Sequence, residues 1–333
     1  MAVATVATTH QDEDAAPPVR RPTGPSSRTR WKRRAPLLPA LVFTIVVTQI
    51  PFLVTLALSS VSWSALRPGD HSFLGLGNYN DFVGFDNYAT VFTDPRLRSA
   101  VVNTITLTVS VVLISLLLGL ALAVLLDRKF PGRGLARTLL IAPFLVMPVA
   151  SALLWKHALY NPTYGLFNGV INGIWKLFGA DHGPTVDFVS SYPMPAVVAA
   201  LVWQWTPFMM LILLAGLQAQ PTDILEAARV DGANGPKIFR HITLPHLRQY
   251  IELSTLLGAI YIVQAFDAIF SITQGGPGSA TTNLPYEIYL TTFRKFEYGE
   301  AAAAGVITVI GTIIVATFAL RVVSSLFRQE QAR

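Results

Sequence analysis

The sequence has 333 residues, of which 52% are apolar and only 13% are charged, whereas soluble domains carry roughly 25% charged residues. Too few polar residues are available to cover a core of this size, so the composition excludes a soluble enzyme. The high apolar content also excludes a wholly disordered chain. The absence of cysteine excludes disulfides, thiolate nucleophiles and cysteine-ligated metals. The net charge of +6 is typical of basic loops in a membrane protein and argues against nucleic-acid binding.

The first residues are polar and rich in Pro, Thr and Ser, which predicts a disordered tail over Met1–Arg34. An apolar run, Pro36–Ser60, follows a basic cluster at the end of this tail. Arg33-Arg34 before such a run is compatible with a twin-arginine export signal. A first transmembrane helix fits better, because the run exceeds the roughly 7–15 residues of a signal-peptide core and further apolar segments follow.

Five later apolar segments also reach the roughly 20 residues that a helix needs to cross a bilayer. They are Val101–Leu126, Thr138–Leu159, Ala196–Gln218, Tyr250–Phe270 and Ala301–Phe327. The sequence therefore predicts an all-α, multi-pass membrane protein with six transmembrane helices. Its membrane domain is expected over residues 35–327, with a short tail over residues 328–333.

The basic residues indicate the orientation of these helices. Of the 25 Lys and Arg residues, 18 fall in the two tails, in the second-to-third loop and in the fourth-to-fifth loop. Since an even number of helices places both termini on one side and basic loops stay in the cytoplasm, both termini are predicted to be cytoplasmic.

Two predicted external loops are long, residues 61–100 and 160–195, and neither has the composition of a soluble domain. The second loop carries apolar residues at three-to-four-residue spacing from Leu166 to Phe178, which predicts a short amphipathic helix. The pattern fits a helix at the outer membrane interface and equally a loop helix packed on the spans.

The cytoplasmic loop over residues 220–249 is far longer than an ordinary connector. Pro221-Thr222-Asp223 predicts a helix start, and Asp223 with Glu226 resembles a capping box. Gly232 predicts a left-handed helix end, after which Gly235-Pro236 starts a second helix and Pro245 is expected to stop it. A compact knob of this kind suits a groove on a partner, although an interfacial hairpin without a partner fits the same pattern.

A spaced motif in this loop resembles a known family signature. The motif reads Glu226-Ala227-Ala228, three residues, Gly232, nine residues, then Ile242-x-Leu244-Pro245. These seven positions match the coupling loop of binding-protein-dependent ABC importer permeases. The chain is most similar to the carbohydrate branch of the type I importer permeases, of the maltose-permease type, over about residues 36–327.

Further segments share this resemblance. They are Gly77-Asn78-Tyr79, Asp94-Pro95, Asn103-Thr104, Phe266-Asp267, Ile272-Thr273, Gly275-Gly276-Pro277 and the run from Tyr298-Gly299 to Ala301-Ala302-Ala303.

The resemblance implies a transport subunit that is not itself an enzyme and binds no cofactor or metal. The sequence has no Gly-x-x-x-x-Gly-Lys-Ser/Thr phosphate loop, so ATP and Mg would be bound on two separate ATPase subunits. A second permease in a heterodimer and an extracellular or lipid-anchored solute-binding protein complete the implied assembly, in the inner membrane of a bacterium. Glu226 would dock on an ATPase and Gly232 would set the turn, coupling ATP hydrolysis to alternating access.

The resemblance also implies a substrate pathway. In the fourth span, Leu201, Trp205 and Phe208 match the region that contacts sugar in this family, and their spacing puts them on one helical face. The aromatic faces suit the C–H faces of a sugar or polyol. Interfacial or packing roles fit the tryptophan as well.

The fifth span offers Tyr261, Gln264 and Asp267 as groups that hydrogen-bond to substrate hydroxyls. Gln264 and Asp267 are three residues apart and are expected to share a helical face. An acid within a span is a functional candidate, but Asp267 lies near the outer boundary, where a solvated or paired role also fits.

Other functions remain open at this stage. A permease of the same superfamily for amino acids or another small solute is the nearest alternative. An ion-coupled secondary transporter predicts paired repeats and several buried acids, whereas Asp267, at a span edge, is the one candidate acid identified. A membrane-embedded enzyme needs acid, histidine or metal clusters near the spans, and the sequence pattern indicates none.

Overall fold

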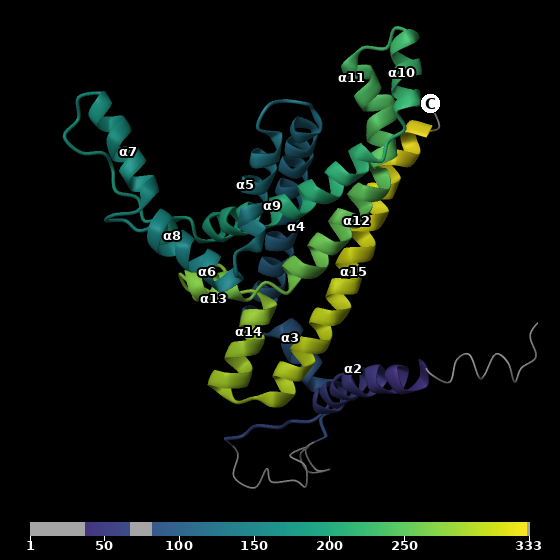
Figure 1. The fold of residues 1–333 in the computed structure, drawn as a ribbon. Helices are drawn as coiled ribbons and strands as arrows, with labels where there is room; N and C mark the ends of the chain where they lie inside the picture. Colours follow the sequence, from purple (N-terminus) through teal and green to yellow (C-terminus); the bar gives the residue numbers. More distant parts are fainter. Residues whose placement is uncertain (1–36, 67–81, 332–333) are drawn as a thin grey trace, which may run out of the picture. The chain divides into compact units, whose positions relative to one another are not determined.

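The computed structural model describes residues 37–66 and 82–331, with side chains as far as residue 318 and at Arg321. The predicted tail, Met1–Arg34, and the Gly77-Asn78-Tyr79 segment lie outside these residues. Every named element in the described part is a helix, as Figure 1 shows. The chain divides into two units, residues 1–53 and 54–333, and the boundary falls within the first helix.

The helices follow one another closely along the chain. They are α2 (Leu38–Leu58), α3 (Asp86–Thr93), α4 (Pro95–Asp127), α5 (Arg133–Leu145), α6 (Pro148–Leu153), η4 (Leu154–Leu159), α7 (Leu166–Leu177), α8 (Phe188–Ser191), α9 (Pro193–Gln218), α10 (Thr222–Val230), α11 (Gly235–Ile238), η5 (Phe239–Thr243), α12 (Leu244–Val263), α13 (Asp267–Ile272), α14 (Leu284–Leu290), η6 (Thr291–Lys295) and α15 (Tyr298–Gln331).

Four helices of the described part are long and apolar enough to cross a membrane: α2, α4, α9 and the Tyr298–Phe318 portion of α15. A fifth crossing results if the bent pair Arg133–Leu145 and Pro148–Leu159 counts as one span. α12 does not reach the required apolarity, because its first turns carry His246, Arg248 and Glu252. The structure thus confirms a helical protein with four or five apolar spans.

The third predicted span, Thr138–Leu159, is not one straight helix. α5 ends at Leu145 and α6 begins at Pro148, with a bend of 97° between the two halves of the span. Met147 has extended backbone angles, φ −56° and ψ 135°, as expected for a residue that precedes proline. The prediction of a continuous helix was therefore wrong, and Pro148 supplies the physical reason.

The fifth predicted span, Tyr250–Phe270, is also interrupted. α12 ends at Val263, Gln264 is its C-terminal cap, and α13 starts again at Asp267. The Asn283 side-chain amide donates to the carbonyl of Ala265 at 2.6 Å and so satisfies backbone freed by the break. Gln264 and Asp267 do not share a face of one helix, contrary to the prediction.

Helices α4, α9 and α12 pack closely in the second unit. Their buried apolar residues include Leu107, Val111, Leu126, Met209, Leu213, Leu247 and Ile262. Gly119 of α4 faces the backbone of α9 directly, since a Cβ at this position would lie 2.9 Å from the Met210 nitrogen. Small residues permit such close approach of helices where dispersion forces must hold a membrane bundle together.

The segment that joins α13 to α14 is tied to α4 by hydrogen bonds. The Asn103 side-chain amide donates to the carbonyls of Ser279 and Thr282, each at 2.9 Å. The Leu284 N–H donates to the Thr104 hydroxyl at 2.9 Å. Asn103 and Thr104 thus hold a long connection against a span.

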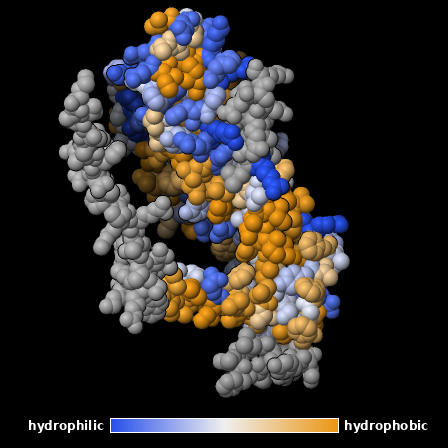
Figure 2. Space-filling model, turned by 90° about the vertical axis from the view of Figure 1, so that its right-hand side faces the viewer, coloured by the Kyte–Doolittle hydropathy of each residue, from blue (hydrophilic) through white to orange (hydrophobic). Residues whose placement is uncertain are grey.

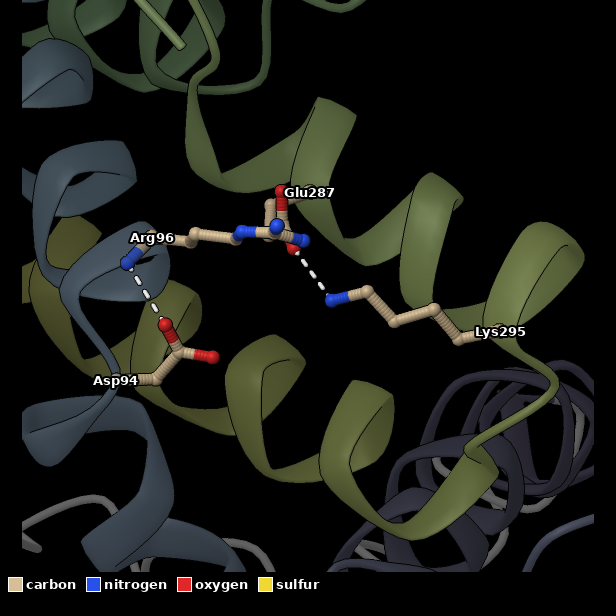
Figure 3. Close-up of polar contacts among 4 residues, drawn as sticks. All are labelled: Asp94, Arg96, Glu287 and Lys295. Carbon is tan, nitrogen blue, oxygen red and sulfur yellow. Dashed lines mark hydrogen bonds and ion pairs between the residues drawn. The ribbon is translucent and has the colours of Figure 1, made fainter. Parts of the chain in front are cut away.

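An ion pair lies beside the start of α4, as Figure 3 shows. Lys295 Nζ donates to Glu287 Oε1 at 2.9 Å, and the Arg96 side chain extends toward the same carboxylate. Asp94 caps α4 by accepting the Arg96 N–H at 2.7 Å. Only 3% of Glu287 is exposed, so a carboxylate is buried here with cationic side chains around it.

The predicted amphipathic helix in the second long loop is confirmed as α7. Asn168 fastens one side of it, donating to the Val186 carbonyl and accepting the Val186 N–H, both at 2.9 Å. Near its C-terminal end, the side chains of Trp175, Leu177 and Phe178 are exposed. The helix is therefore held by its loop and still presents apolar side chains outward.

Candidate functional site

The loop with the spaced motif forms a helical projection. Figure 1 shows α10 and α11 at one end of the second unit, beyond the ends of α9 and α12. Figure 2 shows that hydrophilic residues gather at this end, while hydrophobic residues dominate the surface further along the helices. Glu226 and Ala227 are exposed and Ala228 is half-buried. Ile224 and Val230 are exposed as well, so α10 presents apolar and acidic groups together.

The start of α10 differs from the prediction. The cap residue is Pro221, no side chain caps the helix, and Asp223 lies inside the first turn. Asp223 and Glu226 therefore do not form a capping box. A carboxylate in the first turn still interacts favourably with the helix dipole.

Gly232 ends α10 as predicted. Its φ is +81°, in the left-handed region, and the Ala233 N–H donates to the Ala228 carbonyl at 2.9 Å. A Cβ at Gly232 would meet nothing within 4 Å, so the backbone angle alone explains the glycine.

The second helix of the loop starts as predicted but does not stop at Pro245. Asn234 caps α11 by accepting the Lys237 N–H at 3.2 Å, with Pro236 in the first turn. The wider turns of η5 follow, and α12 then begins at Leu244 with Pro245 in its own first turn, where a missing N–H costs little. Pro245 therefore continues the helix.

The base of the projection is fastened to the spans. Thr243 Oγ1 donates to Gln220 Oε1 at 3.2 Å, and the His246 imidazole bonds to the Gly216 carbonyl at 3.1 Å. A Cβ at Gly216 would lie 2.5 Å from the Tyr250 ring, so α9 and α12 approach closely here. Ile242, Leu244 and Pro245, the last part of the motif, are half-buried at this base.

Three of the predicted pathway residues come together. Trp205 and Tyr261 stack with ring centroids 5.4 Å apart, and Trp205 contacts Phe208 at 5.7 Å. Phe144 of α5 joins them, at 5.8 Å from Trp205 and 5.3 Å from Phe208. Sequence reasoning missed Phe144, because only the packing of α5 on α9 brings it close.

The other predicted pathway residues are not part of this aromatic group. Leu201 lies one helical turn before Trp205 in α9 and belongs to the buried core against which Trp205 and Phe208 pack. The exposed Gln264 amide donates to the Ile260 carbonyl at 3.0 Å, and Asp267 is half-buried at the start of α13. Within the described residues, no ring contact or side-chain hydrogen bond joins Gln264 or Asp267 to Trp205.

A second aromatic cluster surrounds the segment that follows α13. It consists of Phe266, Phe270, Tyr286, Tyr289 and Phe293. Burial raises the pKa of the Tyr286 hydroxyl, and the neighbouring Tyr289 adds to the rise, so the phenol stays protonated at neutral pH. The spacing of 286, 289 and 293 was a sequence signal for this cluster.

No group of three or more His, Asp or Glu side chains within the described part of the chain is placed to hold a metal ion.

Known relatives share the sequence along most of its length. The trehalose/maltose transport system permease protein MalF of Thermococcus litoralis is 32% identical over 295 residues, which is 88% of this chain and 94% of that protein. The sn-glycerol-3-phosphate transport system permease protein UgpA of Agrobacterium fabrum is 33% identical over 251 residues, 74% of this chain and 82% of that protein.

The fold is shared with a solved transporter. A chain of a bacterial ABC transporter involved in the import of the acidic polysaccharide alginate superposes with a TM-score of 0.71 at 21% identity, over 90% of this chain and 96% of that one. Residues 115–329 match the family described as binding-protein-dependent transport system inner membrane component. With this match and relatives above 30% identity along most of their length, the chain belongs to that family, the membrane permeases of ABC importers.

Proposed function

We propose that this chain is the permease subunit of an importer that carries a carbohydrate, either a sugar or a polyol, across the inner membrane of a bacterium. The observation that carries the proposal is the coupling motif, which occupies an exposed helix on a firmly held base. Relatives named for trehalose, maltose and glycerol-3-phosphate support a carbohydrate as the substrate class.

The proposed topology has six transmembrane helices with both termini in the cytoplasm. α12 serves as the sixth crossing, because its twenty residues are long enough and its polar first turns lie next to the loop. The Arg248–Glu252 pair at 2.9 Å reduces the cost of carrying these charges near the membrane boundary.

In the proposed mechanism, α10 sits in a groove of an ATPase subunit. Exposed Glu226 pairs with a basic residue of that subunit, and the exposed side chains of Ile224 and Val230 fill the groove. Movement of the ATPases pulls on α10, and the contacts of Thr243 and His246 transmit this movement to α9 and α12. The spans then alternate between inward-open and outward-open arrangements.

The remaining parts of the assembly are proposed by family analogy. They are a second permease in a heterodimer, two ATPase subunits that bind ATP and Mg, and a solute-binding protein that delivers substrate outside. The family description, binding-protein-dependent transport, supports the last of these.

The aromatic group of Phe144, Trp205, Phe208 and Tyr261 is the proposed substrate contact. Its rings come from α5, α9 and α12, so it joins three helices that move in an alternating-access cycle. Aromatic faces pack against the C–H faces of sugars. Leu201 remains a proposed contact from the resemblance, and Gln264 and Asp267 remain proposed contacts because an amide and a carboxylate can accept hydrogen bonds from substrate hydroxyls.

Uptake into proteoliposomes that contain the whole transporter tests this proposal. We expect ATP-dependent uptake of labelled sugars or polyols that survives a protonophore, and no uptake of amino acids. Glu226→Ala should abolish most of this uptake, whereas Asp231→Asn, which removes an exposed acid outside the motif, should leave it near the native rate.

Two results would contradict the proposal. Uptake driven by a proton gradient without ATP would identify an ion-coupled transporter. Native uptake by Glu226→Ala would exclude α10 as the coupling element, even if a carbohydrate is the substrate.

A further inference from the structure

A basic pocket lies where α4 and α9 end and α5 begins. It is an open pocket of about 600 Å³, lined by Asp127, Lys129, Arg133, Gly134, Arg137 and Gln218. Asp127 ends α4, Arg133 starts α5 and Gln218 ends α9, so three polypeptide segments contribute to one site. Three cationic side chains face one carboxylate here.

The two arginines are held side by side without an anion between them. They are four residues apart on α5 and so share a face. The Gln218 side-chain oxygen accepts from Arg133 Nη2 at 2.8 Å and from Arg137 Nη2 at 3.0 Å, which fixes the amide orientation. Because this acceptor is neutral, it does not offset the repulsion between two guanidinium groups.

Each guanidinium also has unused hydrogen-bonding capacity. The Nε atoms of Arg133 and Arg137 are buried and have no hydrogen-bond partner. Neither arginine takes part in an ion pair within the described part of the chain, unlike Arg248 and Lys295, which pair with Glu252 and Glu287. Buried donors that lack an acceptor are costly, and a pair of cationic forks matches the oxygens of a phosphate group.

The pocket lies at the edge of the apolar layer. The apolar stretches of α4 and α9 end at it, and α5 begins there. On α5, Leu135 and Leu139 are exposed, at 67% and 64%, on the side away from the arginines. One helix thus presents apolar side chains outward, and its first turns carry the charges at the depth where lipid headgroups lie.

We propose that Arg133, Arg137 and Lys129 bind the phosphate of an anionic phospholipid, with Gln218 positioning both guanidinium groups. The lipid source is favoured over free phosphate because of the exposed leucines on the same helix. The inference rests on membrane insertion of the chain and is independent of the transported substrate.

Thermal unfolding of the full chain in neutral detergent tests the inference, with three probes added in turn: phosphatidylglycerol, phosphatidylcholine and inorganic phosphate. A ligand that binds only the folded state raises the unfolding temperature. We expect phosphatidylglycerol to raise it more than phosphatidylcholine at equal concentration. Arg133→Gln/Arg137→Gln should weaken the response so that about tenfold more phosphatidylglycerol is needed.

The matched control is Arg98→Gln/Arg128→Gln, which removes two exposed arginines outside the pocket and should respond as the native chain does. If the glutamine variant fails to fold, Arg133→Lys/Arg137→Lys replaces it, because this variant keeps both charges but lacks the forked guanidinium groups. Its response to phosphatidylglycerol should be weaker than that of the native chain.

Three results would overturn the inference. The first is an equal response of native and glutamine-pair chains to phosphatidylglycerol. The second is an equal effect of inorganic phosphate, which would assign the pocket to a soluble anion. The third is that the Arg133→Gln/Arg137→Gln variant loses its ATPase subunits on purification but still responds to phosphatidylglycerol as the native chain does. This result would assign the arginines to a protein contact.

Discussion

Trp205 of α9 and Tyr261 of α12 stack with their ring centroids 5.4 Å apart and their planes inclined by 26°. Tyr261 is 54% exposed, so this contact is open on one side. It joins two helices that each run into the anchored base of α10 and α11, where Thr243 bonds to Gln220. One ring pair therefore lies on the helices that connect the proposed substrate contact with the proposed coupling element.

Replacing Trp205 by alanine should lower carbohydrate uptake. The change removes the contacts of the Trp205 ring with Phe144, Phe208 and Tyr261. Each such aromatic pair contributes about 0.5–1.5 kcal/mol of interaction free energy. We expect uptake at low substrate concentration to fall about 2- to 10-fold. Trp205→Phe keeps an aromatic face and should recover most of the rate. Equal rates for native and alanine variants at equal expression would remove Trp205 from the pathway.

Replacing Gly232 by alanine should impair coupling without a steric clash. The residue has φ +81° and open space around its Cα, so the cost is conformational, about 1–2 kcal/mol for an L-residue. We expect more ATP to be hydrolysed per molecule imported. Gly235→Ala is the matched control, because Gly235 also has open space but no positive φ. A similar effect of both substitutions would show that the left-handed angle is not what matters.

The local signals of the sequence were sufficient for most of the helices. Long apolar runs predicted α2, α4, α9 and α15 because twenty or more such residues have few other stable states in a protein. Gly232 and Gly235-Pro236 predicted the turn of the coupling loop, because this turn depends only on the local backbone angles of these residues.

Features that depend on contacts between distant segments were not predictable. The 97° bend had a sequence signal in Pro148, but its size depends on packing. The break at Gln264 depends on Asn283, nineteen positions away, and the pairing of Phe144 with Trp205 depends on how α5 crosses α9. The predicted helix end at Pro245 was wrong because the wider turns of η5 precede this proline and accommodate its missing N–H. No short sequence pattern indicates such turns.

Replacing Gly119 by alanine should destabilise the bundle. The new Cβ would lie 2.9 Å from the backbone nitrogen of Met210, and backbone does not yield as a side chain does, so α4 and α9 must separate. Overpacking of this kind costs about 1–3 kcal/mol. Gly311→Ala, in open space on α15, should be neutral or stabilising by up to about 1 kcal/mol. The fraction of protein that remains monodisperse after heating measures both; no loss for Gly119→Ala would refute the close contact.

The ion pair between Glu287 and Lys295 should hold α14 against η6, which Figure 3 shows beside the start of α4. Glu287→Gln keeps the shape but removes the charge that Lys295 Nζ meets at 2.9 Å. A hydrogen bond to a charged group contributes about 1.5–3 kcal/mol, and the lower end applies because 35% of the Lys295 side chain is exposed.

A double-mutant cycle separates this pair from its surroundings. Lys295→Met alone leaves Glu287 buried at 3% exposure with Arg96 extending toward it, so it should cost less than an isolated buried charge. The combined Glu287→Gln/Lys295→Met variant should lose less unfolding free energy than the two single variants lose together. The difference, which is the coupling energy of the pair, should be about 1 kcal/mol or more. Additive losses in the unfolding free energy would mean that Arg96 neutralises Glu287 and that Lys295 contributes nothing to the stability of α14.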